Sequence, residues 1–508
     1  MIFGDKLFIM SKQEHDQGDI RGKVGGRLVV ANAKTLKILA EFDEIGGDGR
    51  ACLGVTPEKA YIGSNAGIRV LHFEDGVFTL ESTGIKGIGN DSESGSSDIG
   101  NNQALYNKQV GDMVLAGKYA YAIQQGVGVH IIDIDTDALV RTIGDTGVQG
   151  IVQDGSGNVW FASTAGITES GTTLLHEIDY LTGEEIRTVT VPGTIGCSWG
   201  SWRSTNFFAD LNDRILYWNG ASSGITSSGS VIYRWDIDAD PQAENIKPFF
   251  TLSTQPGVTS DVTRVMYATM RLDHRNNSIL FATTTAPSGN YRYNWYNFID
   301  ASTGDILSQV RLKDYYWFPA LPIFPDAHAP EIASIDPISI TIPRAESQSG
   351  ASASYDPVEF RINATDKDNN DHNIGYRILN AEDLEDIADV SLDGNKVTIT
   401  PKKAGSGNLT LMAHSNGVPS IVDVPLTIVN ETPDGVAEIA DGDIIINGRR
   451  VRVRNLDGTD FMIYDMSGKP AAAFTAAGDD CSVYLGLNSG AYVLIDNSGK
   501  RKVKFIIM

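Results

Sequence analysis

The chain has 508 residues, 41% of them hydrophobic and 21% charged, so it is long enough to form more than one domain with a sizeable core. Its formal net charge of −23 argues against a nucleic-acid partner, because phosphate binding needs a basic surface. No apolar run is long enough to cross a bilayer, and Lys6 interrupts a short apolar start that lacks the regions of a signal peptide. We therefore expect an exported protein whose signal segment is absent from this chain.

The first two-thirds of the chain repeats a unit of four short β-rich runs. The clearest copy, residues 110–144, has runs at 112–115, 119–123, 129–134 and 139–143, separated by glycine or aspartate turns. Such a unit predicts a four-stranded antiparallel meander. Partial copies centre on 4–39, 60–71, 158–184, 214–236 and 278–305. A spacing of about 40 to 50 residues, with four strands per unit, is the signature of a β-propeller.

Six units are visible, and a partial seventh begins at Phe318–Phe324. The chain opens at Met1–Phe3, already inside a blade. We predict an all-β protein with a seven-bladed propeller, its first blade incomplete at the N-terminus. The alternative is six blades with an irregular seam.

Several connections between units are rich in aromatic residues and arginine. The polar insertion Gly84–Lys108 is either a mobile flap or a loop that embraces a ligand. Connections from the outer strand of one blade to the inner strand of the next converge on one face of a propeller, so their side chains meet. Aromatic side chains with a polar handle, and arginine beside them, hold a bulky ligand or a protein partner, although they also wedge blades together. We predict a ligand-binding surface made by Arg50, Tyr106, Trp199, Trp202, Arg203, Tyr267, Tyr315, Tyr316 and Trp317.

Catalytic motifs are missing from the sequence. There is no GxSxG, HExxH or phosphate-binding glycine loop, and the eight histidines have no recurrent partner. We therefore expect no enzymatic activity. A propeller hydrolase would need a metal held by carboxylates such as Asp154, Asp210 and Asp273, but these three precede second strands, where turn chemistry also explains them.

Residues 331–431 contain short alternating runs at 358–362, 396–400, 409–413 and 424–429, which predict a second, sandwich domain after a propeller over 1–330. Its segment Ala364–Asp371, followed by Ile374–Ile378, resembles the acidic loop and strand of cadherin-like domains. That resemblance implies calcium at Asp366, Asp368 and Asp371, because several oxygen ligands on one loop suit a hard cation. The alternative is a turn built from Asp and Asn side chains that holds no metal. No other cofactor is expected.

A last small β-sandwich is predicted over 436–508. Alternating runs cover 451–455, 461–469 and 487–495. The order IYDMSGK, LNSGAYVLI and a basic ending at Lys500–Lys504 resembles the C-terminal sorting domain of the type IX secretion system. This resemblance implies export to the cell surface or the medium. An ordinary Ig-like module without a sorting role is the alternative.

The propeller resembles YncE-like surface proteins of the DUF5074 type. The resemblance is carried by Gly4–Met10, the turn Ala33–Leu36 and Trp317–Pro325. Some members of that family resemble surface lipoproteins that capture cobalamin for a TonB-dependent transporter, although this chain lacks a lipidated N-terminal cysteine and adds two domains. The resemblance implies a non-catalytic cell-surface protein that captures a corrinoid-like nutrient for an outer-membrane transporter. Adhesion or scaffolding through a surface glycan or protein is a second hypothesis, and a metal-dependent propeller hydrolase is a third.

Overall fold

The structure is a computed structural model. It describes the chain except residues 11–25, 44, 46–48, 65–66, 90–109, 168–169, 196–205, 221–228, 253–262, 266–269, 286–292, 315–327, 344–354, 431–443, 500 and 508, and the side chains of Arg50, Thr263, Arg264 and Thr285. Within the described residues the helices are four short 3-10 segments, Glu74–Gly76, Ala243–Asn245, Asp371–Asn373 and Ala381–Leu384. The predicted all-β class is confirmed.

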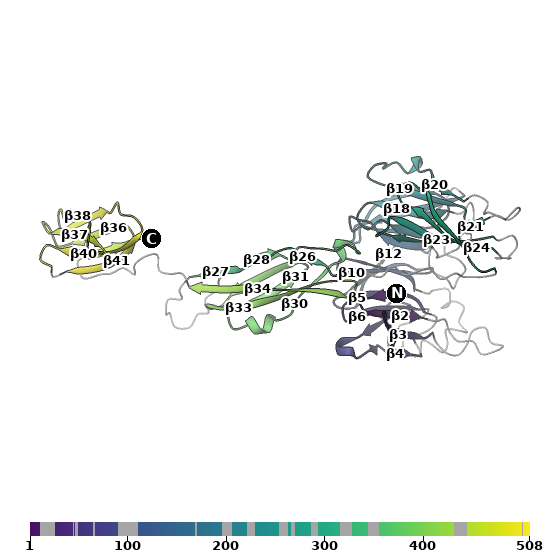
Figure 1. Ribbon diagram of the computed structural model, residues 1–508, viewed down its shortest axis with the longest axis horizontal. Coiled ribbons are helices and arrows are strands. Elements are labelled where there is room, and N and C mark those ends of the chain that lie inside the picture. Colours follow the sequence, from purple (N-terminus) through teal and green to yellow (C-terminus); the bar gives the residue numbers. More distant parts are fainter. Residues whose placement is uncertain are drawn as a thin grey trace. The chain divides into compact units, whose positions relative to one another are not determined.

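Six antiparallel sheets follow one another along residues 2–311 and form the blades of a propeller (Figure 1, purple to teal). The first three blades are β1 (Ile2–Phe3), β2 (Lys6–Met10), β3 (Leu28–Asn32) and β4 (Ile38–Phe42); β5 (Gly49–Thr56), β6 (Lys59–Ser64), β7 (Gly67–His72) and β8 (Thr79–Leu80); and β9 (Val110–Ala116), β10 (Tyr119–Gln124), β11 (Gly128–Asp133) and β12 (Ala138–Ile143). The next three are β13 (Val148–Gln153), β14 (Val159–Ser163), β15 (Thr172–Ile178) and β16 (Glu185–Pro192); β17 (Phe207–Ala209), β18 (Ile215–Gly220), β19 (Val231–Asp236) and β20 (Pro248–Thr251); and β21 (Thr263–Val265), β22 (Arg271–Asp273), β23 (Ser278–Thr285), β24 (Asn294–Asp300) and β25 (Ile306–Arg311).

Strands within each blade are ordered as in the sequence. In the sixth blade the first strand is in two pieces, because β21 and β22 both pair with β23. The first blade has four strands, but β1 is only two residues long. The predicted start of a seventh blade, Phe318–Phe324, lies outside the described residues, so the seven-blade count stays a prediction.

An Asp or Asn at the end of the third strand forms the next turn in most blades. The Oδ1 atom of Asp179 accepts hydrogen bonds from the backbone of Leu181 and Thr182 at 3.0 and 2.8 Å. The backbone N–H of Thr182 and its hydroxyl hold the pKa of Asp179 below its ordinary value. Equivalent side-chain-to-backbone bonds start the turns after β3, β11, β19 and β24, from Asn32, Asp133, Asp236 and Asp300. The aspartate turns of the predicted repeat therefore have a direct physical cause.

The core of the propeller lies between neighbouring blades. Each cluster of buried apolar side chains combines two consecutive blades, and these clusters join blades one to two, two to three, three to four, four to five and five to six. Between the fourth and fifth blades, for example, the rings of Trp160 and Trp235 meet edge to face, with centroids 5.9 Å apart. A blade therefore buries its two faces only when its neighbours are present.

Two further sets of sheets follow the propeller along the chain, and their identity as two small sandwich domains stays a prediction. The first has a sheet of β27 (Ile338–Ile342), β34 (Val418–Asn430), β33 (Gly405–Ser415) and β30 (Gly375–Ile378), a sheet of β28 (Val358–Arg361), β32 (Lys396–Pro401) and β31 (Ala388–Asp393), and the short pair β26 (Glu331–Ile332) and β29 (Ala364–Thr365). The second has a sheet of β35 (Ile444–Asn447), β36 (Arg450–Arg454) and β39 (Asp480–Tyr484), and a sheet of β38 (Pro470–Thr475), β37 (Asp460–Asp465), β40 (Gly490–Asp496) and β41 (Lys502–Ile507).

The chain forms two compact units, each made of several segments. The first unit contains Met1–Ser334 together with Ile362–Arg377 and Leu411–Val422. The second contains Ile335–Arg361, Ile378–Thr410 and Asp423–Met508. Two segments of the predicted second domain therefore belong to the same unit as the propeller.

No helix in the described part of the chain is long and apolar enough to span a membrane.

Candidate functional site

One end of the propeller is defined by the turns that join the first and second strands of the blades. In the six described blades these inner turns are residues 4–5, 57–58, 117–118, 154–158, 210–214 and 274–277. The two segments Ile362–Arg377 and Leu411–Val422, which we call the cap, contact this end. They belong to the same compact unit as the inner turns.

The cap reaches the first three blades through hydrogen bonds and an ion pair. The backbone N–H of Gly4 donates to the carbonyl of Asn416 at 2.6 Å. Gly4 has a positive φ of 57°, and a Cβ there would lie 2.8 Å from the carbonyl oxygen of Gly417, so only glycine fits this approach. In the second blade, Arg377 Nη1 donates to Glu58 Oε2 at 2.7 Å. In the third blade, the N–H of Gly117 lies 3.4 Å from the side-chain oxygen of Asn373.

The other three blades meet the cap through amide and charged groups. Asn370 Nδ2 donates to the carbonyl of Asp154 in the fourth blade at 2.8 Å and lies 3.4 Å from the carbonyl of Leu211 in the fifth. Arg275 Nε in the sixth blade donates to Asp368 Oδ1 at 3.1 Å. The cap therefore bonds with the inner strands or turns of all six described blades, and this end of the propeller is occupied by the chain itself.

Carboxylates in or next to three inner turns of the propeller have structural partners. Asp154 is fully buried, and its Oδ2 accepts hydrogen bonds from Trp160 Nε1 at 2.9 Å and from Arg214 Nε at 3.1 Å. Its Oδ1 accepts the backbone N–H of Ser156 at 2.9 Å. Asp210 and Asp273 likewise accept backbone N–H groups two residues further on. The interpretation of these three aspartates as turn formers is confirmed.

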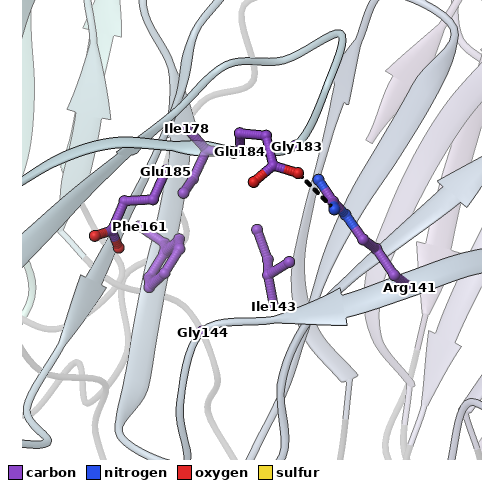
Figure 2. A pocket seen from close by; sticks show the side chains of 8 residues that line it. All are labelled: Arg141, Ile143, Gly144, Phe161, Ile178, Gly183, Glu184 and Glu185. Carbon is purple, nitrogen blue, oxygen red and sulfur yellow. Dashed lines mark hydrogen bonds and ion pairs between the residues drawn. The ribbon is translucent and has the colours of Figure 1, made fainter.

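A pocket of about 320 Å³ opens between the third and fourth blades (Figure 2). Phe161 and Ile143 form apolar walls, and Arg141, Glu184 and Glu185 place charged groups on the rim. Arg141 Nη1 donates to Glu184 Oε1 at 2.8 Å, so the ion pair lies across the pocket. The other lining residues are Gly144, Ile178 and Gly183.

Glu185 is held in place by a histidine behind the pocket. His176 Nδ1 lies 2.7 Å from Glu185 Oε2, and this hydrogen bond holds the pKa of Glu185 below its ordinary value. The imidazole stacks on the Phe161 ring with centroids 4.5 Å apart. The pocket is thus a crevice of mixed polarity, with apolar walls and charged side chains at its rim. Sequence reasoning missed it because its walls come from two different blades.

None of the predicted ligand-binding side chains can be placed. Tyr106, Trp199, Trp202, Arg203, Tyr267, Tyr315, Tyr316 and Trp317 lie outside the described residues, as does the side chain of Arg50. The backbone of Arg50 lies in β5. The predicted aromatic surface therefore stays a prediction.

All three predicted calcium ligands are described, and they lie in the cap. Asp366 Oδ1 accepts the backbone N–H groups of Asp368 and Asn369 at 2.6 and 3.0 Å, and Asp371 Oδ1 accepts the N–H of Asp366 at 2.8 Å. Asp368 faces cationic or donor groups outside the loop. Among the described residues, no group of three or more His, Cys, Asp or Glu side chains is arranged to hold a metal ion.

Comparison with known proteins identifies a family for the propeller. A family model described as "Domain of unknown function (DUF5074)" matches residues 1–325. No curated protein matches the chain.

Among solved structures, similar chains include a quinonprotein alcohol dehydrogenase-like protein from Bacteroides thetaiotaomicron, at 12% identity and a TM-score of 0.39 over 60% of this chain. PorZ, a surface component of the type IX secretion system of Porphyromonas gingivalis, has 12% identity and a TM-score of 0.37 over 99% of this chain. The β-propeller domain of Cps50 (Swd1) from Myceliophteria thermophila has 10% identity and a TM-score of 0.35 over 61% of this chain and 89% of its own. The chain spans 66% and 58% of the first two structures, and at this level of similarity none of the three carries a functional argument.

Proposed function

The chain belongs to the DUF5074 family, and from the arrangement of its propeller we propose that it is a non-catalytic, cell-surface binding protein that captures a bulky nutrient such as a corrinoid. The captured molecule would be passed to an outer-membrane transporter of the TonB-dependent class. The observation that carries this proposal is that the cap occupies one end of the propeller, at the inner turns of all six described blades.

Occupation of one end restricts where a large ligand can approach. The strands of each blade alternate in direction, so the connections from one blade to the next leave from the ends opposite the inner turns. The chain between β8 and β9, residues 81–109, and between β16 and β17, residues 193–206, contains Tyr106, Trp199 and Trp202 of the predicted aromatic set. A ligand of corrinoid size would bind at that end, where aromatic faces and arginine supply contact area and orientation.

The C-terminal module, which contains the strands β35 to β41, supports a location outside the cell. Within the sequence IYDMSGK, Asp465 Oδ1 accepts the backbone N–H groups of Ser467 and Lys469 at 2.9 and 3.0 Å, so this motif is an ordered turn between β37 and β38. The sequence LNSGAYVLI leads into β40, which lies between β37 and β41. We propose that this module directs the protein to the cell surface or the medium.

Calorimetric titration of the full chain with cobalamin and cobinamide tests the proposal. A nutrient scavenger should saturate at one ligand per chain with a dissociation constant below about 1 μM, equivalent to about −8 kcal/mol. Substitution of Trp199, Trp202 or Trp317 by Ala should weaken binding by at least about tenfold if each ring contacts the ligand. Tyr484→Ala is a matched control, because Tyr484 is 72% exposed in the C-terminal module.

Two results would contradict the proposal. The absence of heat at high micromolar corrinoid would exclude this ligand class and favour adhesion through a glycan or protein, which glycan and matrix-protein arrays would detect. Tryptophan variants that bind as tightly as the unmodified protein, or that only lower its melting temperature, would exclude the aromatic surface.

A further inference from the structure

The acidic segment Asp366–Asn373 makes most of the cap's side-chain contacts with the propeller. Asp368 is its central charged group, with only 7% of its side chain exposed. Its Oδ1 accepts a hydrogen bond from Arg275 Nε at 3.1 Å, and its Oδ2 lies 2.5 Å from His328 Nδ1. The backbone N–H of His328 also donates to Oδ2 at 3.2 Å. Both carboxylate oxygens of Asp368 therefore face donors from outside the segment.

The polar side chains that follow extend the contact to other blades. Asn373 Nδ2 donates to Gln153 Oε1 at 2.7 Å, and the amide of Asn370 donates to the carbonyl of Asp154. The imidazole of His372 lies 3.1 Å from the hydroxyl of Tyr180 and packs against Gly157, where a Cβ would come within 3.0 Å of the ring. This interface is tight enough that an alanine at Gly157 would collide with it.

The same segment does not fit calcium. Calcium takes about six to eight oxygen ligands at about 2.3–2.6 Å. Here Asp368 already pairs with the guanidinium of Arg275, whose positive charge would repel a divalent cation, and Oδ1 of Asp366 and of Asp371 accepts backbone N–H groups. Asp366 Oδ2, buried and without a hydrogen-bond partner, is a single oxygen and supplies too few ligands by itself.

The resemblance to a calcium loop has a simple origin. Closely spaced Asp and Asn residues form tight turns by accepting hydrogen bonds from backbone N–H groups two or three residues further on. Asp366 makes two such bonds, and Asn370 accepts one from His372 N at 2.9 Å. The pattern that suits a cation also suits a rigid loop that projects amides and a carboxylate towards a neighbouring surface.

We propose that Asp366–Asn373 is an intramolecular latch, which holds the cap on the inner turns of the propeller and works without calcium. The partner surface is the set of carbonyls, amides and cations presented by the third to sixth blades. This proposal does not depend on the ligand of the opposite end, so the absence of corrinoid binding would leave it intact.

Hydrogen exchange of the full chain, followed by mass spectrometry, tests the latch. Asp368→Asn removes the charge that pairs with Arg275, and we expect exchange to become at least about tenfold faster in Ile362–Arg377 and in the inner turns of the fourth and sixth blades. Arg275→Gln should accelerate the same peptides, and it serves as the second variant if Asp368→Asn does not fold. Asp389→Asn is the matched control, because Asp389 is 66% exposed and pairs with Lys402. It should leave these peptides unchanged.

Calcium is tested on the same protein. Neither the rate of hydrogen exchange nor the melting temperature should differ between excess EDTA and about 10 mM calcium chloride. That calcium concentration is above the dissociation constants of weak extracellular calcium modules. Calorimetry with calcium chloride should give no saturable heat. Saturable calcium binding that Asp368→Asn abolishes would overturn the proposal, and so would unchanged exchange in both Asp368→Asn and Arg275→Gln.

Discussion

His130 shows how the packing of a single blade fixes the protonation state of a side chain. It is 1% exposed on β11, and its two ring nitrogens lie 2.8 Å from Thr142 Oγ1 and from Gln124 Oε1. Burial lowers the pKa of His130 from 6.5 to about 4. These contacts give His130 a structural role within the third blade.

We expect His130 to remain neutral at pH 5 in the folded protein. The pKa of His130 is lower in the folded state than in the unfolded state, so the neutral imidazole stabilises the folded protein. This contribution to the free energy of unfolding is complete above about pH 6.5. It is lost as the pH falls towards about 4, at about 1.4 kcal/mol per pKa unit, or about 3 kcal/mol in total. Histidine-labelled NMR, with His130→Gln to assign the signal, measures the titration directly. A midpoint near 6.5 would contradict this expectation.

Arg214 is the cation that balances two buried carboxylates between the fourth and fifth blades. Asp154 and Glu177 are 0% and 2% exposed, and Arg214 pairs with both. Glu177 also accepts a hydrogen bond from Arg187 Nε at 2.7 Å, and the Arg187 guanidinium lies 5.5 Å from the Trp160 ring. Removal of Arg214 leaves the buried charge of Asp154 without a cation, whereas Glu177 keeps Arg187.

Arg214→Met should therefore destabilise the propeller by about 3–5 kcal/mol, whereas Arg141→Met should cost less than about 1 kcal/mol. Arg141→Met is the matched control, because Arg141 pairs with Glu184, which is 72% exposed and well solvated. Calorimetric melting of both variants provides the comparison. Equal losses in the two variants would show that burial does not govern these ion pairs.

At the scale of elements, the repeat was predictable from the sequence because each strand depends on local patterns. The runs expected at 119–123 and 139–143 are β10 and β12, within one residue at each end. Alternating apolar residues and the aspartate turns determine these strands, and both patterns lie within one blade. The inner strand β17, of three residues, was not predicted, since it is too short to show a period.

Tyrosines on the second strands of three blades form hydrogen bonds with the next blade. Tyr121 on β10 donates to the carbonyl of Tyr180, in the next blade, at 2.9 Å. Tyr61 on β6 and Tyr217 on β18 reach the corresponding turns one blade further on, at Asp137 Oδ1 and the carbonyl of Ala301, at 2.5 and 2.9 Å. Each hydroxyl satisfies a polar group at the seam between two apolar layers.

Tyr121→Phe should destabilise the propeller by about 1–2 kcal/mol, because it leaves the Tyr180 carbonyl without this donor. The Tyr121 ring is fully buried and is retained in the variant, so packing is preserved. Tyr119→Phe on the same strand is a matched control, since its side chain is partly exposed, and it should change stability by less than about 0.5 kcal/mol. The melting temperatures of the two variants decide the question, and similar shifts would argue against the interblade bond.

For the whole molecule, the contact between the cap and the propeller could not have been predicted. Arg377 and Glu58 are 319 residues apart, and no sequence pattern pairs them. The acidic segment was recognised, but its chemistry permitted both a metal and a turn, and only the partners Arg275 and His328 distinguish the two. The predicted ligand-binding residues lie outside the described residues, so the aromatic surface depends on binding experiments alone.

The C-terminal module differs from the rest of the chain in both charge and core. Residues 444–508 contain nine Lys and Arg against six Asp and Glu, a net charge of +3, so the remainder carries −26. The buried cluster formed by Ile444, Phe461, Leu494 and their neighbours draws all its members from residues 444–507. A core of its own predicts a melting transition of its own, because cooperativity follows shared burial.

Phe461→Ala should therefore remove or lower one calorimetric transition and leave the propeller transition unchanged. Phe461 is fully buried and stacks on Phe474 with ring centroids 5.1 Å apart. Loss of such a ring costs about 3–5 kcal/mol, which lowers the melting temperature of a module of this size by more than about 10 °C. Tyr484→Ala, at a 72% exposed side chain, should shift neither transition. A propeller transition that falls together with that of the module would show that the two cores unfold as one.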